Sequence, residues 1–201
     1  MSTSKRLFIG LELTQMHKEN LAEMDKRLRM FLKEGTIVSK DDFHLTLKFL
    51  GDTKVDRIPV IEEAMKNVSE KVQLFLTEIS GLGEFGQGSK KMVWVGIKHK
   101  EKIAKLYELI EEELQALFFE KSEFPFVPHI TLAKDSTFIE TIESIEDLKA
   151  KLTFGKLPLL VTKIVLFENV REDEYDKYQV LFEAPLMYNQ EQIEEAKRQE
   201  A

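Results

Sequence analysis

Two short stretches of the sequence carry the same side chains, of types that can perform acid–base chemistry. The pattern His-x-Thr-Leu occurs at His44–Leu47 and again at His129–Leu132, in a chain that has four histidines. An imidazole has an unperturbed pKa near 6.5, so one histidine can accept a proton while another donates one near neutral pH. A threonine hydroxyl can donate a hydrogen bond to an oxygen on which negative charge develops. The two motifs together therefore point to chemistry at a phosphate.

Each motif predicts a strand with one polar face and one apolar face. In an extended chain, residues i and i+2 share a face and lie roughly 6.5–7 Å apart. His44 and Thr46 therefore share a face, and the apolar residues around them, including Phe49, are expected on the other face. The same alternation applies to His129 and Thr131. If the polar faces of two lobes meet, these four side chains line one central cleft.

Cleavage of a phosphodiester by in-line attack needs a base on the attacking side of phosphorus and an acid on the leaving side. His44 and His129 are predicted to be this pair, and each role typically contributes about 10²–10⁴ in rate. Thr46 and Thr131 are predicted to bind the phosphate oxygens. The scheme requires neither a metal ion nor another cofactor, and none is predicted. The spacing of the motifs leaves open which histidine starts as the base.

The alternative is that both histidines are structural, since a single histidine on a half-buried strand more often has a packing role. The recurrence of the whole motif, in a chain with four histidines, favours the functional interpretation. The other two are expected to be ordinary surface residues. His17 falls on the polar face of a predicted helix, and His99 falls at the end of a predicted strand.

The composition narrows the classes of function. The chain has 201 residues, 43% of them hydrophobic, which is enough for one large domain or two lobes that share a core. A net charge of −7 argues against binding of extended nucleic acid through its phosphates, but it is compatible with a small anionic group held in a local pocket. The absence of cysteine excludes a disulfide framework and a thiolate nucleophile. No signal peptide or membrane-spanning run is recognised, so a cytoplasmic monomer without membrane contact is expected.

Hydrophobic periodicity predicts a chain of alternating helices and strands. The predicted strands are Arg6–Leu13, His44–Leu50, Val72–Ile79, Met92–Lys98, one that begins at His129, Leu159–Phe167 and Tyr178–Ala184. The predicted helices are one between Thr14 and Gly35, Asp56–Lys71, Glu101–Phe119 and Glu143–Lys151. The order strand, helix, His-x-Thr-Leu strand thus occurs twice. We expect one bilobal α+β domain over residues 1–187, with one motif strand in each lobe, and a polar tail over residues 188–201.

Other residues could be functional or structural. Phe8 lies on the non-core face of the first strand, where it could contact a nucleobase or pack against neighbours. Lys48 and the glutamate run at 111–114 are expected to be solvated, and Trp94 is expected to pack beneath a helix. The segment at 81–86 matches G-x-G-x-x-G, but a strand follows it where a dinucleotide site needs a helix.

The two motifs resemble those of the two-histidine phosphoesterase superfamily, and within it the RNA 2′,3′-cyclic phosphodiesterases, also known as 2′-5′ RNA ligases. The similar segments are RLFIGLEL, FHLTLKFLG, GLGEFGQGSKKMVWVGI, FVPHITLAKD and KIVLFENV, which span nearly the whole chain. The resemblance implies a bilobal α+β fold with pseudo-two-fold symmetry, in which two antiparallel sheets face each other around a central cleft and helices lie outside.

The resemblance also implies a metal-free activity. A terminal 2′,3′-cyclic phosphate would be hydrolysed to a 2′-phosphate, with His129 activating water and His44 protonating the departing 3′-oxygen. Reverse 2′-5′ ligation would exchange the two roles. Open alternatives are a nucleotide-binding module of the same fold with little catalysis, and a two-histidine phosphoesterase for another cyclic or carrier-linked phosphodiester.

The chain departs from the family in two places. Lys134 stands where the family commonly has an arginine, five residues after the second motif histidine. Lysine keeps the positive charge but lacks the planar fork that binds two phosphate oxygens at once, so looser or differently oriented phosphate binding is expected. The stretch EDEYDKY, residues 172–178, lacks the glycine often found before the last strand, which bears on substrate preference.

Overall fold

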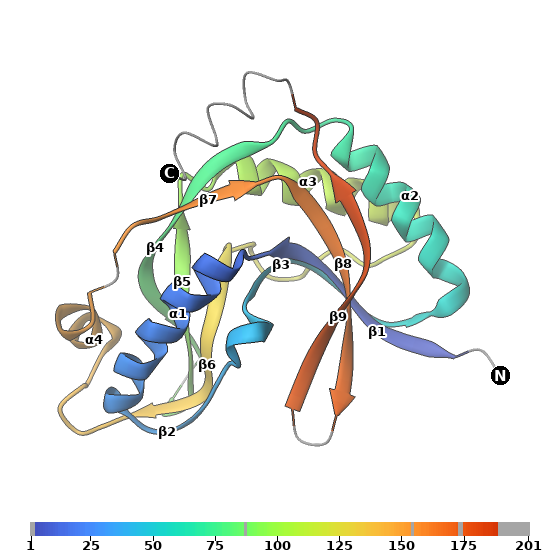
Figure 1. Ribbon diagram of the computed structural model, residues 1–201. Helices are drawn as coiled ribbons and strands as arrows, with labels where there is room; N and C mark the ends of the chain where they lie inside the picture. Colours follow the sequence, from blue (N-terminus) through green and yellow to red (C-terminus); the bar gives the residue numbers. More distant parts are fainter. Residues whose placement is uncertain (1–2, 87, 154, 173–174, 189–201) are drawn as a thin grey trace.

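The structure is a computed structural model that describes residues 3–86, 88–153, 155–172 and 175–188. It contains two antiparallel sheets with helices packed around them (Figure 1), so the predicted α+β fold is confirmed. The strands are β1 (Ser4–Glu12), β2 (Leu32–Ile37), β3 (His44–Lys54), β4 (Phe75–Phe85), β5 (Lys91–Lys98), β6 (His129–Phe138), β7 (Leu157–Val161), β8 (Lys163–Glu172) and β9 (Tyr175–Pro185). The helices are α1 (Gln15–Leu28), α2 (Ile58–Ser69), α3 (Glu101–Ala116) and α4 (Ile145–Lys151).

The sheets are not built from the two halves of the sequence. The four-stranded sheet has the order β3-β1-β8-β9, so the last two strands of the chain pair with the first. The five-stranded sheet has the order β2-β6-β5-β4-β7 and takes β2 from the N-terminal half. Each sheet nevertheless holds one motif strand, β3 in the first and β6 in the second. The chain crosses between the sheets several times, which ties them together.

Local sequence signals explain where the helices begin. Thr14 caps α1, because its hydroxyl accepts a hydrogen bond from the backbone N–H of His17. Pro59 occupies the first turn of α2, where its missing N–H costs nothing. Ser144 and Asp147 form a reciprocal capping box at the start of α4. The predicted start of the first helix directly after Thr14 is confirmed.

The predicted end of the first helix was wrong. The helix stops at Leu28 and a short 3₁₀ turn follows, after which Leu32–Ile37 forms β2. Gly35 lies within this strand with a φ of 141°, and a Cβ there would lie 2.6 Å from Ser136 Oγ on the neighbouring β6. This glycine therefore permits a close approach of two strands and does not end a helix.

Two predictions about strands were also wrong. The strand predicted to end at Ile79 continues through the glycine-rich stretch from residue 80 to 85 as part of β4. Gly83 has no side chain because the indole of Trp94 lies over it, and a Cβ there would be 2.2 Å from the ring. The single strand expected over Leu159–Phe167 is two strands, β7 and β8, which belong to different sheets and are separated at Thr162.

One large apolar core joins both sheets to the helices. Its fully buried members come from β1, β3, β4, β5, β6, β8 and β9 and from all four helices; examples are Ile9, Leu21, Leu45, Ile61, Ile79, Val95, Ile103, Ile130, Leu148, Ile164 and Ala184. Burial of such side chains contributes about 1.5–3 kcal/mol each. A second, small cluster of Phe8, Val165 and Phe167, with Tyr178 against it, lies apart from this core.

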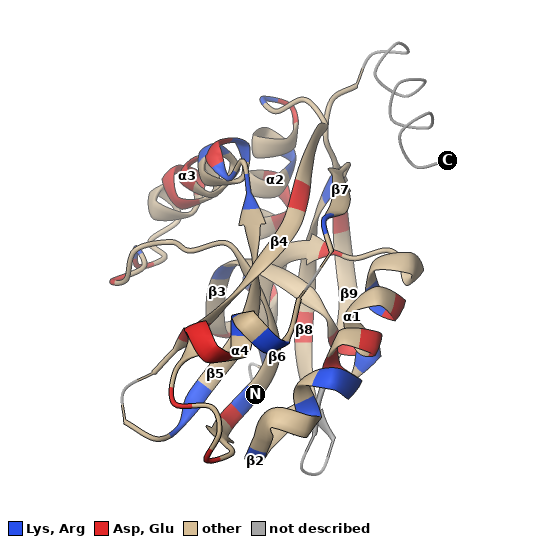
Figure 2. Cartoon of the chain, turned by 90° about the vertical axis from the view of Figure 1, so that its left-hand side faces the viewer, with Lys and Arg blue, Asp and Glu red and all other residues tan. Residues whose placement is uncertain are grey.

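Charged residues of both signs are interspersed along the helices. Figure 2 shows blue and red segments alternating on α1 and α3, without a continuous basic run on either helix. Some form pairs one turn apart, such as Lys26 with Glu23. Within the described residues, no helix is both long and apolar enough to cross a membrane. Only Tyr188 of the predicted polar tail is described, and it is exposed; residues 189–201 lie outside the described part of the chain.

Candidate active site

The two motif strands lie side by side where the sheets meet. β3 is the edge strand of the four-stranded sheet, and it contacts β6 of the five-stranded sheet (Figure 1). His44 and His129 are the first residues of these strands. The positive charge of a protonated His129 acts on the His44 ring, so the fold brings the two predicted catalytic residues within electrostatic reach of each other.

The His44 ring has a defined orientation. Its Nδ1 lies 2.7 Å from the backbone carbonyl oxygen of Asp42, and its Nε2 lies 3.0 Å from the hydroxyl of Thr46. A carbonyl oxygen can only accept, so Nδ1 carries the hydrogen. In the neutral ring, Nε2 is then the basic nitrogen, and the predicted partner Thr46 lies directly beside it.

The His129 ring has the same arrangement. Its Nδ1 lies 2.6 Å from the backbone carbonyl oxygen of Val127, two residues upstream. Both rings therefore donate from Nδ1, which leaves Nε2 as the nitrogen that could exchange a proton with a bound molecule. The hydroxyl of Thr131, on the same face, donates to Met92 Sδ at 3.7 Å. Thioether sulfur is a weak acceptor, so this hydroxyl can be redirected to a phosphate oxygen at little cost.

Aromatic side chains support His44. The rings of Phe8 and Tyr178 lie 4.8 Å and 4.6 Å from it, and Phe8 stacks on Phe167 at 4.9 Å. Phe8 is only 2% exposed. A side chain so deeply covered has no free ring face for a nucleobase, so the predicted substrate contact of Phe8 is corrected to its alternative, a packing role beneath His44.

A second aromatic group supports His129. Phe85 contacts its ring edge-on at 4.9 Å, and Trp94 lies 5.9 Å away. The prediction that Trp94 packs beneath a helix was therefore wrong. Trp94 pairs with Thr131 across β5 and β6, which places the indole on the face that carries the motif side chains. The glycine opposite, Gly83, was the signal in the sequence that could have indicated a large ring above it.

A β-bulge interrupts the alternation of β3 directly after the motif. Thr46 pairs with Gly10 of β1, but the next pair is Lys48 with Ile9, so Leu47 is the extra residue. Lys48 thereby turns to the core side, where Ile9 is fully buried. The prediction that Lys48 is solvated was wrong.

The same bulge turns Phe49 to the other side. Phe49 pairs with Phe8, its ring lies 6.0 Å from the Phe8 ring, and it is 72% exposed. Strict alternation from His44 placed this phenylalanine in the core, and that prediction was wrong. It is an aromatic side chain on the face of His44 with most of its surface open.

β6 has an equivalent bulge. Thr131 pairs with Trp94 and Ala133 pairs with Val93, so Leu132 is the extra residue. Ala133 is turned into the core, where it is fully buried. A β-bulge thus follows each of the two motifs, as expected for two strands related by pseudo-two-fold symmetry.

Lys134 follows that bulge and lies on the face of the motif side chains. Its positive charge acts on His44 across the junction of the sheets. In a regular strand, a residue five positions after His129 would point away from it. The bulge therefore turns Lys134, the cation predicted to bind the phosphate, onto the same face as His129.

Burial and positive charge act on the two imidazoles. Desolvation is the largest cause that lowers the pKa of His44, to about 4, with the charges of Lys134 and His129 acting in the same direction. The carbonyl of Asp42 opposes this fall because it stabilises the protonated ring. Desolvation also lowers the pKa of His129, and the carbonyl of Val127 opposes it. Both rings are neutral near pH 7 in the unliganded protein.

Three ionisable residues assigned to the surface are buried. His17 is 1% exposed, and its Nε2 lies 2.7 Å from the carbonyl oxygen of Pro158, which fastens α1 to β7. Lys48 and Glu111 are each 4% exposed and form an ion pair of 2.9 Å. Their burial could not be read from residue type, because each depends on a partner far away in the chain.

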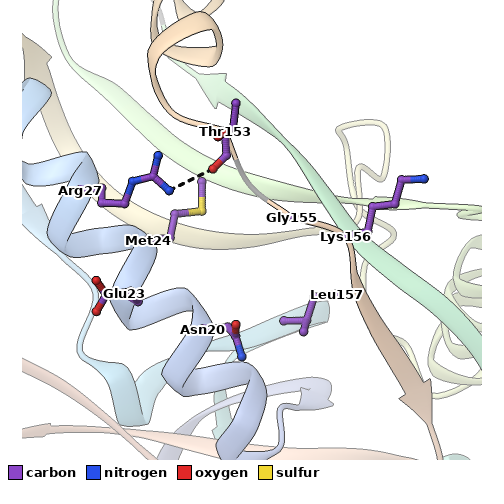
Figure 3. Close-up of a pocket in the computed structure, with 8 residues that line it drawn as sticks. All are labelled: Asn20, Glu23, Met24, Arg27, Thr153, Gly155, Lys156 and Leu157. Atoms are coloured by element: carbon purple, nitrogen blue, oxygen red, sulfur yellow. Dashed lines mark hydrogen bonds between the residues drawn. The ribbon is translucent and has the colours of Figure 1, made fainter. Parts of the chain in front are cut away.

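A pocket of about 210 Å³ lies elsewhere, between α1 and the segment before β7 (Figure 3). The figure shows Arg27 donating to the carbonyl oxygen of Thr153, at 3.2 Å. The lining residues are Asn20, Glu23, Met24, Arg27, Thr153, Gly155, Lys156 and Leu157. None of the predicted site residues borders this pocket, and its mixed charges give it no evident part in phosphate chemistry.

Comparison with known proteins agrees with this geometry. Residues 19–173 match the family model described as the 2′-5′ RNA ligase superfamily. The chain is 30% identical over 185 residues to an RNA 2′,3′-cyclic phosphodiesterase of Geobacillus stearothermophilus, covering 90% of this chain and 57% of that protein. It is 28% identical over 180 residues to one of Thermotoga maritima, covering 89% of this chain and 94% of the relative. The chain thus spans little more than half the length of the first relative and nearly all of the second.

Solved structures share the fold. The Escherichia coli LigT crystal structure in apo form aligns with a TM-score of 0.73 at 21% identity, covering 93% of this chain and all of LigT. The crystal structure of TT0787 from Thermus thermophilus aligns with a TM-score of 0.75 at 21% identity, covering 90% of this chain and 97% of that one. The family model covers most of the sequence, and the fold and the duplicated motif agree with it. The chain belongs to the 2′-5′ RNA ligase superfamily.

Proposed function

We propose that this protein hydrolyses the terminal 2′,3′-cyclic phosphate of RNA to a 2′-phosphate by acid–base catalysis with His44 and His129. The observation that carries the proposal is that two imidazoles from different sheets have the same tautomer, each held by a carbonyl two residues upstream. Each ring thus reserves Nε2 for the reaction. The relatives named RNA 2′,3′-cyclic phosphodiesterase support the choice of substrate.

The reaction balances with these two groups. Nε2 of His129 takes a proton from water as the water oxygen bonds to phosphorus, and the bond from phosphorus to the 3′-oxygen breaks. His44, protonated at Nε2, gives its proton to the departing 3′-oxygen. The product has a 2′-phosphate and a free 3′-hydroxyl. In ligation an RNA 5′-hydroxyl takes the place of water: His129 takes its proton, its oxygen bonds to phosphorus, and His44 again protonates the departing 3′-oxygen. The roles are exchanged when that 2′-5′ linkage is cleaved back to the cyclic phosphate.

This assignment, which the family resemblance implied, requires His44 to be protonated when substrate is bound. In the free protein its pKa is lowered to about 4, so the ring is neutral at pH 7. The phosphodiester anion supplies the opposite charge that favours the protonated ring. Substrate binding is therefore coupled to uptake of a proton.

Three side chains are proposed to bind the phosphate. Thr46 lies 3.0 Å from the reactive nitrogen of His44, and Thr131 occupies the matching place after His129. Lys134 brings a positive charge to the same space. A lysine ammonium attracts the anion as a point charge, whereas an arginine fork would also fix its orientation.

Phe49 is proposed to replace Phe8 as the nucleobase contact. It is exposed, it lies on the face of His44, and the Phe8 ring connects the two. Unpaired bases stack on exposed aromatic rings whatever their sequence. Recognition of the RNA end therefore needs no extended basic surface, in keeping with the net charge of −7. We further propose that the protein acts as a cytoplasmic monomer on RNA ends or small cyclic nucleotides, and not on duplexes.

A product-resolved assay tests this function. An oligonucleotide with a 2′,3′-cyclic phosphate is incubated with the protein, with and without a metal chelator, and the 2′- and 3′-phosphate products are separated. We expect a 2′-phosphate that forms equally fast with chelator present. His44→Ala and His129→Ala are each expected to lose at least about 10²-fold in rate. His99→Ala is the control; turnover unchanged in either motif variant would refute the proposal.

A further inference from the structure

Lys48 and Ala133 occupy the same place in the two bulged strands, four residues after the motif histidine and on the core side. Ala133 is the residue expected there, small and apolar. Lys48 is a charged residue at 4% exposure. Burial of a lysine costs free energy, and a buried ion pair is often no more stabilising than apolar residues of similar volume. Packing alone therefore does not account for Lys48.

The contacts of Lys48 lead away from its own sheet. Its Nζ lies 2.9 Å and 3.1 Å from the two carboxylate oxygens of Glu111 on α3, and it donates to the carbonyl oxygen of Glu120 at 2.5 Å. Ser122 donates to Glu111 at 3.2 Å. One ammonium on β3 is thus bonded both to α3 and to residues 117–128, which connect α3 to β6.

This connecting segment supplies the group that orients His129. The carbonyl oxygen of Val127 accepts the hydrogen bond from His129 Nδ1 at 2.6 Å. The neighbouring Phe126 stacks on Tyr107 of α3, with ring centroids 4.1 Å apart and planes 4° apart. Residues 117–128 contain no helix or strand, so side-chain contacts set the position of the Val127 carbonyl.

We propose that Lys48 and Glu111 are positioning residues for the second motif. They fasten segment 117–128 to the strand that carries His44, and thereby place the Val127 carbonyl that holds His129 with Nε2 free. The inference rests on the proposed proton-transfer role of His129 for its effect on catalysis. The positioning role itself concerns the tautomer of the His129 ring, which can be measured without substrate.

The test is the double variant Lys48→Met with Glu111→Leu. It replaces the buried pair by apolar side chains, which such sites accept, and it removes the bonds to Glu120 and Ser122. Nitrogen-15 NMR of the histidine rings reports the tautomer of each. We expect His129 to populate the Nε2–H form and its pKa to fall further, because the Val127 carbonyl favours the protonated ring. His44 should keep its Nδ1–H form, since Asp42 is untouched, and serves as the internal reference.

Catalysis provides an independent measurement. In the double variant, kcat for a 2′,3′-cyclic phosphate is expected to fall about tenfold while KM changes less than about threefold, since a small misplacement of a proton-transfer group affects the chemical step. A purely structural role would lower the melting temperature and leave the ring signals as they are. If the wild-type protein itself shows no turnover, the proposed function fails and the NMR measurement still decides the positioning role.

A matched control is available on the same helix. Lys71→Met with Glu113→Leu removes an ion pair of 2.6 Å from α3 that involves neither β3 nor segment 117–128. Its histidine signals should match those of the wild type. If the Lys48 and Glu111 double variant does not fold, Ser122→Ala breaks one bond of the segment without burying a charge, and a smaller change at His129 is expected. Ring signals of His129 that stay unchanged in a folded variant would overturn the proposal.

Discussion

Phe49 and Lys134 occupy equivalent positions, each five residues after a motif histidine and each turned onto the histidine face by a β-bulge. In one lobe this position carries an aromatic ring that is 72% exposed. In the other it carries a cation whose charge reaches His44. The duplicated framework therefore offers two different contacts, one suited to a base and one suited to a phosphate.

Phe49→Ala is expected to raise KM for 2′,3′-cyclic AMP roughly tenfold with little change in kcat, because stacking on an aromatic ring contributes about 1–3 kcal/mol per base. Phe49→Tyr should retain the wild-type KM. Methyl ribofuranoside 2′,3′-cyclic phosphate, which has no base, should be turned over equally by wild type and Phe49→Ala. Phe118→Ala is the control, because Phe118 is 92% exposed just beyond the end of α3. Equal loss on both substrates would show that Phe49 is not a base contact.

Two substitutions of Lys134 distinguish the effect of its positive charge on phosphate binding from the effect of its side-chain geometry. Lys134→Met should raise KM about tenfold or more, because the loss of a hydrogen bond to a charged group typically weakens binding by about this factor. It should also raise the pKa of His44 toward its ordinary value, because the Lys134 charge lowers it. NMR titration of His44 measures that shift directly. Lys134→Arg should lower KM, since the guanidinium can bind two phosphate oxygens; a KM higher than that of Lys134→Met would contradict a phosphate contact.

The low pKa of His44 predicts proton uptake on binding. When the protein binds a non-hydrolysable cyclic phosphate analogue at pH 7, it is expected to take up close to one proton. The reason is that binding converts a neutral His44 into the protonated acid. Calorimetry in buffers of different ionisation enthalpy counts the protons. His44→Ala should abolish the uptake, whereas Thr46→Val, which leaves the ring in place, should retain it. Binding without proton exchange would argue against His44 as the acid.

The roles of the two histidines can be distinguished by the leaving group. A substrate with sulfur at the 3′ position has a leaving group that needs no proton. His44→Ala should regain most of its rate on this substrate, because the missing acid is no longer required. His129→Ala should remain impaired, since water must still be activated. Rescue of His129→Ala instead would reverse the assignment of acid and base.

The buried carboxyl of Asp25 is expected to make the free energy of unfolding depend on pH, and this expectation does not rest on the proposed function. Burial raises the pKa of its carboxyl to about 8, and its Oδ1 has no hydrogen-bond partner among the described residues. The folded state therefore keeps a proton that the unfolded state releases above its ordinary pKa of 3.8. The free energy of unfolding should fall as pH rises from about 4 to about 8, by at most about 1.4 kcal/mol per unit from this group.

The variant Asp25→Asn resembles the protonated carboxyl. Its free energy of unfolding in urea should exceed that of the wild type by a small margin at pH 5 and by a larger margin at pH 8, because the loss from Asp25 begins near pH 4 and grows up to about pH 8. Glu23→Gln, which changes an exposed carboxylate two residues away, is the control and should differ little at either pH. A difference that is the same at both pH values would show that Asp25 ionises normally.

The sequence by itself determined the motifs, their strands and the chemistry they point to. Two imidazole and threonine pairs at i and i+2 identify one face of a strand, because the period of an extended chain is local and needs no partner. Caps such as Thr14 are local in the same way, and the structure confirms that helix start. These features follow from a few neighbouring residues.

The tertiary structure decided the rest. The bulges that turn Lys48 inward and Phe49 and Lys134 outward are set by register with β1 and β5, which no local period contains. The burial of Lys48 depends on Glu111, 63 residues away. Strand β2 joins the second sheet although it precedes the first motif. Register, charge burial and sheet membership are properties of pairs of distant segments, so they are settled only when the chain packs.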